Sequence, residues 1–159
     1  MKLKILLIIL ILSSLLFVYK DIVNNHKEVN TFELSYIDLD MIKDLKAYTL
    51  VNFCSSNNSI CNKFQPTLKI LFNELSGNDI KIFNINIFEN TELLNNFPIN
   101  LIPIQFFFTK DGKSYKPSEA LGLDFQNTIM NEKEFYYHIG VLSKEEIIKI
   151  LNEMQLNQL

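Results

Sequence analysis

Apolar residues recur along the chain with two different spacings, and these predict alternating strands and helices. Compact apolar runs at residues 48–53 and 79–88 are typical of buried strands. Between them, apolar residues recur every three or four positions over residues 60–75, as on one face of a helix. Pro66 lies inside this pattern, and we expect a kink there. The order of strand, helix and strand indicates an α/β domain with parallel strands at its core.

Shorter elements are predicted on both sides of this core. Alternating apolar residues at 32–36 predict a short strand, and Asp38 is a candidate N-cap for a short helix after it. Residues 89–97 predict another short helix. Residues 102–115 predict a strand, a tight turn and a return strand, which would add an antiparallel edge to the sheet. Residues 118–133 have no clear period and are interpreted as a loop or insertion.

The last part of the chain predicts a strand at residues 134–140 and then a helix. Ser143 is the candidate N-cap, and Glu146 lies three positions further on, which is the pattern of a capping box. In such a box the two side chains satisfy N–H groups at the helix start. The elements together predict a central mixed sheet flanked by helices.

The N-terminus is the most apolar part of the chain. Lys2 and Lys4 precede a largely apolar run at residues 5–18, which is typical of a secretory signal. With the residues next to it, the segment is just long enough to span a membrane. No small residues suited to cleavage follow it, which favours a retained signal anchor over a cleaved signal peptide. We therefore interpret residues 1–20 as this segment and residues 21–31 as a linker. Lysines on the N-terminal side predict a single-pass protein of the cell membrane with its domain outside the cytoplasm, or a secreted protein if the segment is cleaved.

Composition narrows the possible functions of the domain at residues 32–159. Hydrophobic residues make up 48% and charged residues 21%, as in a globular protein with a core. A net charge of -3 gives no indication of nucleic-acid binding. Two cysteines and two distant histidines do not form a convincing metal site, so neither a metal nor a cofactor is expected. An extracytoplasmic compartment would permit one disulfide between Cys54 and Cys61, provided that their Cα atoms lie within about 7 Å.

Several segments resemble the thioredoxin family over residues 30–157. The run "TLVNF" resembles the strand that leads into the active site of that family, and Cys61 stands five positions before Pro66, as the second active-site cysteine does before the kinking proline. "NLIPIQFFFTKDGK" resembles the strand that follows the family's cis-proline, which makes Pro103 the candidate. "HIGVLSKEEIIKILNEM" resembles the closing strand and helix. The resemblance implies a thioredoxin-like fold, with residues 115–134 as an insertion found in some bacterial and archaeal members.

The same comparison reveals three departures from the family's active site. The family uses a C-x-x-C motif whose first cysteine attacks the substrate disulfide, and here Asn58 stands three positions before Cys61. Asn57 replaces a common tryptophan, and Asn52 replaces an aspartate that many members bury beneath the cysteines. The three changes predict a degenerate site without normal dithiol–disulfide exchange.

Our leading hypothesis from the sequence is a binding module that keeps the fold without turnover. The resemblance implies that Ile102 and Pro103 offer a backbone edge to extended peptide segments, with Asn57 and Asn58 beside it. Such a surface does not require the missing cysteine.

Two alternatives keep the cysteines in use. The first is a thiol–disulfide oxidoreductase that acts on protein thiols through Cys61, with or without Cys54. By resemblance, a polytopic membrane carrier of reducing equivalents would be its partner. The second is a monothiol protein in which Cys61 alone forms reversible adducts. Cys61 could also be an inert, buried small residue.

Overall fold

The computed structural model describes residues 31–77, 79–89 and 91–157. The predicted membrane segment and linker at residues 1–30 therefore lie outside the described residues. In chain order, the elements are β1 (Glu33–Leu34), α2 (Leu39–Leu45), β2 (Tyr48–Cys54), α3 (Ser59–Leu75), β3 (Ile80–Asn86), the 3-10 helix η1 (Thr91–Asn95), β4 (Ile104–Phe108), the 3-10 helix η2 (Glu119–Leu121), β5 (Gln126–Met130), β6 (Lys133–Ile139) and α4 (Lys144–Leu156).

The strands form one six-stranded mixed sheet in the order β1-β3-β2-β4-β6-β5. β1 and β2 run parallel to β3, whereas β4 runs antiparallel to β2 and β6 antiparallel to β4. β2 lies in the middle, and every one of its residues is buried. This confirms the predicted mixed sheet, and it explains why the sequence of β2 is apolar on both faces.

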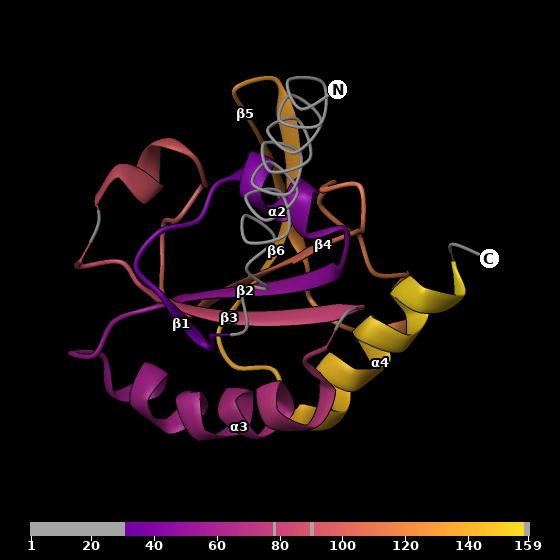
Figure 1. Ribbon diagram of the computed structural model, residues 1–159, viewed down its shortest axis with the longest axis horizontal. Helices are drawn as coiled ribbons and strands as arrows, with labels where there is room; N and C mark the ends of the chain where they lie inside the picture. Colours follow the sequence, from indigo (N-terminus) through magenta and orange to yellow (C-terminus); the bar gives the residue numbers. More distant parts are fainter. Residues whose placement is uncertain (1–30, 78, 90, 158–159) are drawn as a thin grey trace, which may run out of the picture.

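Helices cover both faces of the sheet. Figure 1 shows α3 and α4 along one face and α2 on the opposite side of β2 and β3. The layer beneath α3 and α4 includes Leu50 of β2, Ile82 of β3, Phe107 of β4, Phe64 and Leu68 of α3, and Ile147 and Leu151 of α4. The opposite layer is dominated by phenylalanines, namely Phe53, Phe83, Phe97, Phe106, Phe108 and Phe135. The sheet is therefore the middle of three layers, and its two faces have separate cores.

The helix starts follow the predicted capping chemistry. The side chain of Asp38 accepts a hydrogen bond from the N–H of Met41 at the start of α2. Ser143 and Glu146 form the complete capping box of α4. The backbone N–H of Ser143 donates to the Glu146 carboxylate, and this bond lowers the pKa of Glu146.

The predicted return after residue 112 is present, but it is too short to form a strand. The antiparallel pairing after the turn is limited to the bridge between Ser114 and Phe108, with hydrogen bonds from the N–H of Thr109 to the Lys113 carbonyl and from the N–H of Tyr115 to the Phe107 carbonyl. Further along β4, the partner at Ile104–Phe106 is β6. The interpretation of residues 118–133 as a loop is also wrong in part, since β5 pairs with β6 across a turn at Asn131 and Glu132, both with positive φ. β5 is an outer strand with no fully buried residue, so it lacks the apolar alternation that would have revealed it.

The segment between β4 and β5 is fastened to α4 by one carboxylate. Glu153 accepts hydrogen bonds from the hydroxyl of Tyr115 at 2.6 Å and from the N–H of Ser118 at 2.9 Å, and also from the Ser118 hydroxyl. Burial raises the pKa of Glu153, but the bonds from Ser118 and Tyr115 outweigh it and leave this pKa lowered. Burial, together with the bond to Glu153, raises the pKa of Tyr115 to about 12.

Replacement of this carboxylate by a neutral amide should destabilise the domain in a pH-dependent manner. A lowered pKa in the folded state adds stability above the ordinary value of 4.5, and this contribution is lost as the pH falls through the folded-state pKa. We expect Glu153→Gln to lower the free energy of unfolding by about 1 kcal/mol at pH 7 and by less at pH 3. Urea unfolding at both values measures the difference. Glu119→Gln is the control, since Glu119 is exposed in the same segment; an equal loss in both variants would contradict the role of Glu153.

Candidate functional site

The two cysteines of the chain are joined by a disulfide where β2 meets α3. Cys54 is the last residue of β2, and Cys61 is the third residue of α3. Their Cα atoms are 5.6 Å apart, which satisfies the distance that a disulfide requires. Both side chains are buried, with 5% of Cys54 and 3% of Cys61 exposed, so contact with another molecule depends on the shape of the surface above them.

Asn58 holds the start of α3 beside this disulfide. Its side-chain oxygen accepts hydrogen bonds from the N–H groups of Ile60 at 2.9 Å and Cys61 at 3.1 Å, which makes it the N-cap of the helix. Asparagine is among the best N-cap residues because it satisfies N–H groups that have no partner within the helix. Asn58 therefore has a structural role of its own at the position where the sequence analysis placed a missing nucleophile. Asn57 next to it is exposed.

The electrostatic surroundings of Cys61 favour negative charge on its sulfur. The backbone N–H of Ser55 points at Cys61 Sγ at 3.4 Å. Cys61 also lies in the first turn of α3, a helix of 17 residues, where the helix dipole is positive. Both features stabilise a thiolate, so Cys61 is the better leaving group of the pair when the disulfide is opened.

A row of neutral amides crosses the sheet on the face that carries Cys54. Asn52 Nδ2 donates to Asn84 Oδ1 at 2.7 Å, and Gln105 Nε2 donates to Asn52 Oδ1 at 2.8 Å and to the Gly140 carbonyl at 3.0 Å. Asn52 and Gln105 are fully buried. The row contains no ionisable side chain, so it offers the cysteines no carboxylate as a proton acceptor.

The sequence analysis identified Asn52 but missed Asn84 and Gln105. Gln105 is the only polar residue of β4, and Asn84 lies between apolar residues of β3; these interruptions were the available signal. Their meaning depends on the strand register, which places Asn84 and Gln105 on either side of Asn52.

The peptide bond between Ile102 and Pro103 is cis, as the sequence led us to expect. Phe53 pairs with Ile104 in the antiparallel ladder of β2 and β4, so the next position along this register places Pro103 across from Cys54. The Pro103 carbonyl accepts a hydrogen bond from the N–H of Gly140 at 2.9 Å. The structure thus brings Cys54, Cys61 and Pro103 to one end of β2, while the binding roles of Ile102 and Pro103 stay predictions.

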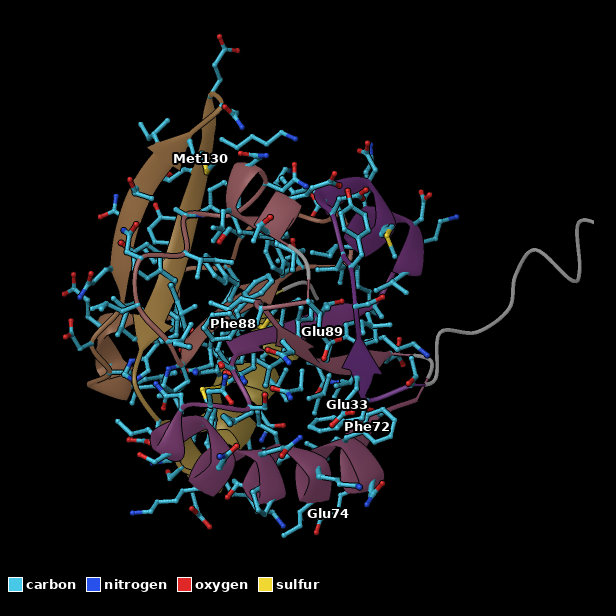
Figure 2. All side chains as sticks on the ribbon, turned by 90° about the vertical axis from the view of Figure 1, so that its left-hand side faces the viewer. Glu33, Phe72, Glu74, Phe88, Glu89 and Met130 are labelled. Atoms are coloured by element: carbon cyan, nitrogen blue, oxygen red, sulfur yellow. A yellow bond between two sulfur atoms is a disulfide. The ribbon has the colours of Figure 1, made fainter. Side chains whose placement is uncertain are left out.

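A groove of about 480 Å³ gives access to the disulfide from the side of β1 and β3. Both cysteines line it, together with Asn84 and Asn86 from β3 and Gln65 from α3. Figure 2 looks toward this side of the molecule and shows Glu33 and Glu89, which also line the groove, above the ribbon of α3. The disulfide is thus buried in the protein but forms part of the wall of an open, polar groove.

The family model of thioredoxin matches residues 39–132 of the chain. The chain belongs to the thioredoxin family. Three solved structures share its fold at low sequence identity. Chloroplastic thioredoxin z is 17% identical with a TM-score of 0.57, and the match covers 82% of this chain and 99% of that one. The thioredoxin of Malassezia sympodialis is 12% identical with a TM-score of 0.52, covering 78% and 91%.

The third structure is a mutant thioredoxin from Halobacterium salinarum, which is 13% identical with a TM-score of 0.54 and covers 77% of this chain and 88% of that one. A search of curated proteins finds no match. These similarities confirm the predicted thioredoxin-like fold, and activity has to be argued from the site of this thioredoxin-family protein itself.

Two further properties concern the described part of this thioredoxin-family chain. None of the helices within residues 31–157 is long and apolar enough to cross a membrane, and the predicted anchor at residues 1–20 lies outside the described residues. The histidine, cysteine and acidic side chains of the described residues form no group of three or more that could hold a metal ion.

Proposed function

We propose that this thioredoxin-like protein exchanges thiols and disulfides through Cys54 and Cys61. The observation that carries the proposal is the disulfide between the end of the central strand and the first turn of α3, in the wall of an open groove. The sequence analysis ranked this function second, because it looked for the attacking cysteine at residue 58. The cysteine pair is instead spaced by six intervening residues, and Cys54 at the end of β2 takes the place of the absent partner.

The exchange would begin at Cys54. A thiolate of the partner attacks Cys54 Sγ, the bond between the two cysteines breaks, and its electron pair leaves on Cys61 Sγ. The N–H of Ser55 and the start of α3 stabilise the thiolate formed there. A second partner thiolate then attacks the partner sulfur of the mixed disulfide, which releases Cys54 as a thiolate and the partner as its own disulfide. Two electrons have passed to the protein, and both thiolates take up protons from water.

The reverse direction would reduce a substrate disulfide. The Cys54 thiolate attacks the substrate and forms a mixed disulfide, and Cys61 then resolves it by attacking Cys54 Sγ. Because the amide row beneath the site holds no charge, a thiolate on either cysteine meets no negative neighbour within that row. Cys54 is therefore the residue that we assign to contact with the substrate, and Cys61 the resolving residue.

The location and partner form part of the same proposal. Residues 1–20 would hold the domain on the outer side of the cell membrane, where disulfides persist. Protein thiols would be the substrates, and a polytopic membrane protein would exchange electrons with the cysteine pair.

A redox titration tests whether the disulfide is exchangeable or purely structural. The full-length chain is equilibrated in graded mixtures of reduced and oxidised dithiothreitol, and free thiols are labelled and counted by mass. We expect a reversible transition of both cysteines with a midpoint above about −300 mV, because structural disulfides lie below that value. Near-ultraviolet circular dichroism should show a folded domain throughout. A pair that is reduced only below this potential, or only on unfolding, would contradict the proposal.

A binding module remains the second candidate. Its support is the position of Pro103, which the strand register places across from Cys54. Leu101, two residues before Pro103, is 61% exposed. Binding of an unfolded client protein should then persist in the variant Cys54→Ser/Cys61→Ser. If this double variant no longer binds the client protein, the surface serves thiol exchange and not independent binding.

A further inference from the structure

The charge of the groove bears on which thiols can reach the disulfide. Its lining includes only two ionisable side chains other than the cysteines, and both are acidic: Glu33 and Glu89. The remaining polar lining consists of neutral amides and hydroxyls, namely Ser35, Ser55, Ser56, Asn62, Gln65, Asn84 and Asn86. Among the described residues, the charged side chains of the groove are therefore all negative.

The two carboxylates are fixed on different walls of the groove. Glu33 belongs to β1, pairs with Asn84 of β3 in the parallel ladder, and accepts a hydrogen bond from Gln65 Nε2 at 2.8 Å. Glu89 follows β3 and accepts a bond from Asn86 Nδ2 at 2.9 Å. Figure 2 shows both on the same side of the molecule. Within the described ranges, neither carboxylate forms an ion pair, so their charges are not neutralised by a lysine.

The thiolate that attacks the disulfide is itself an anion. A negative groove repels it, unless the attacking molecule also carries positive charge near its sulfur. The two carboxylates produce this discrimination, and dissolved salt weakens it. The amides that hold Glu33 and Glu89 keep the charges in place without cancelling them.

We infer that the groove selects thiols with an adjacent positive charge, such as an aminothiol or a cysteine between basic residues, and excludes acidic thiols. This inference rests on the proposed exchange at Cys54 and Cys61. It assigns Glu33 and Glu89 to substrate selection, through charge and not through contact with the reacting sulfur atoms.

The test compares three small thiols that differ in charge: cysteamine, 2-mercaptoethanol and 2-mercaptoethanesulfonate. The rate at which each reduces the disulfide of the full-length chain is measured at low salt and divided by its thiolate concentration. In the wild type we expect cysteamine to react roughly tenfold faster than the sulfonate, with mercaptoethanol between them. In Glu33→Gln/Glu89→Gln, and in the wild type at high salt, the ratio should fall to about 2 or less.

Glu74→Gln is the matched control, because Glu74 lies on α3 outside the groove and pairs with Lys144. It should leave the ratio unchanged. The ratio within one variant cancels the reactivity of its disulfide, and comparing this ratio between the wild type and the double variant cancels the intrinsic reactivity of each thiol. A wild-type ratio near one, or the same ratio in the double variant, would overturn the inference while leaving the proposed exchange intact. Failure of all three thiols to reduce the folded protein would instead overturn the proposed function and the inference with it.

Two peptides test whether the groove selects cysteines of proteins or small aminothiols. A peptide with lysine on both sides of its cysteine is compared with one that has glutamate at those positions. A preference for the basic peptide supports selection of protein substrates, and a preference confined to cysteamine supports small aminothiols. Faster reaction of the acidic peptide would overturn the inference.

Discussion

Replacement of either cysteine by serine should reduce the rate of insulin reduction to that of the uncatalysed reaction. The exchange needs one sulfur to form the mixed disulfide and the other to resolve it, so neither cysteine is sufficient alone. We expect a loss of roughly 100-fold or more for Cys54→Ser and for Cys61→Ser, as for other residues that act as a unit. The measurement is insulin turbidity with dithiothreitol as the electron donor and the full-length chain as catalyst.

The two variants should differ in what they trap. In Cys61→Ser, Cys54 remains in the groove wall without a resolving partner, so a substrate stays attached to it as a mixed disulfide visible by mass. Ser55→Ala is the matched control, because it changes a groove side chain but keeps the N–H that points at Cys61 Sγ. Wild-type turnover in both cysteine variants would show that the observed reduction does not use the disulfide.

The parts of the fold that local chemistry specifies were predictable from the sequence. The capping box of α4 depends on two side chains three positions apart, and the buried strands depend on uninterrupted apolar runs. The path of the chain after β4 was not predictable in the same way. The return after the turn pairs only with the last part of β4, and the partner of β4 at Ile104–Phe106 is β6, about twenty residues further along the chain.

The residues of the candidate site could likewise be predicted only where a local motif specifies them. The resemblance identified Cys61, Asn58 and the cis-proline, because each has a fixed distance in sequence from a neighbour in the motif. The disulfide was left open, since it depends on how closely the end of β2 approaches α3. Neither the amide row nor the acidic groove has a local signal, because their residues come from different strands that only the sheet register brings together.

Asn58 illustrates how a motif can mislead when it is considered alone. At the position of the family's attacking cysteine, it indicated that the chemistry was lost. In the structure its side chain caps α3 and donates nothing to the disulfide, while the second sulfur comes from β2. A degenerate C-x-x-C motif therefore does not by itself show that this fold lacks an exchangeable cysteine pair.

The largest loss of stability is expected at Phe97, which follows η1 and lies outside any strand. It is fully buried, and its ring lies 4.9 Å from that of Phe53 and between 5.8 and 6.2 Å from those of Phe106, Phe108 and Phe135. Phe97→Ala would remove the central ring of this cluster and leave a cavity that the strands cannot fill. We expect the free energy of unfolding to fall by about 3–5 kcal/mol, measured by urea unfolding of the oxidised protein.

Phe88→Ala is the control, since Phe88 has the same side chain but is 67% exposed, and it should change stability by less than about 0.5 kcal/mol. Phe53 joins the cluster to the site, because it directly precedes Cys54 in β2. If Phe97→Ala remains folded, the end of β2 loses part of its support, and the disulfide should become easier to reduce than in Phe88→Ala. Equal stability of the two variants would mean that the phenylalanine cluster does not hold this face of the sheet together. Equal reducibility despite a large loss of stability would mean that the disulfide is positioned by α3 and the amide row alone.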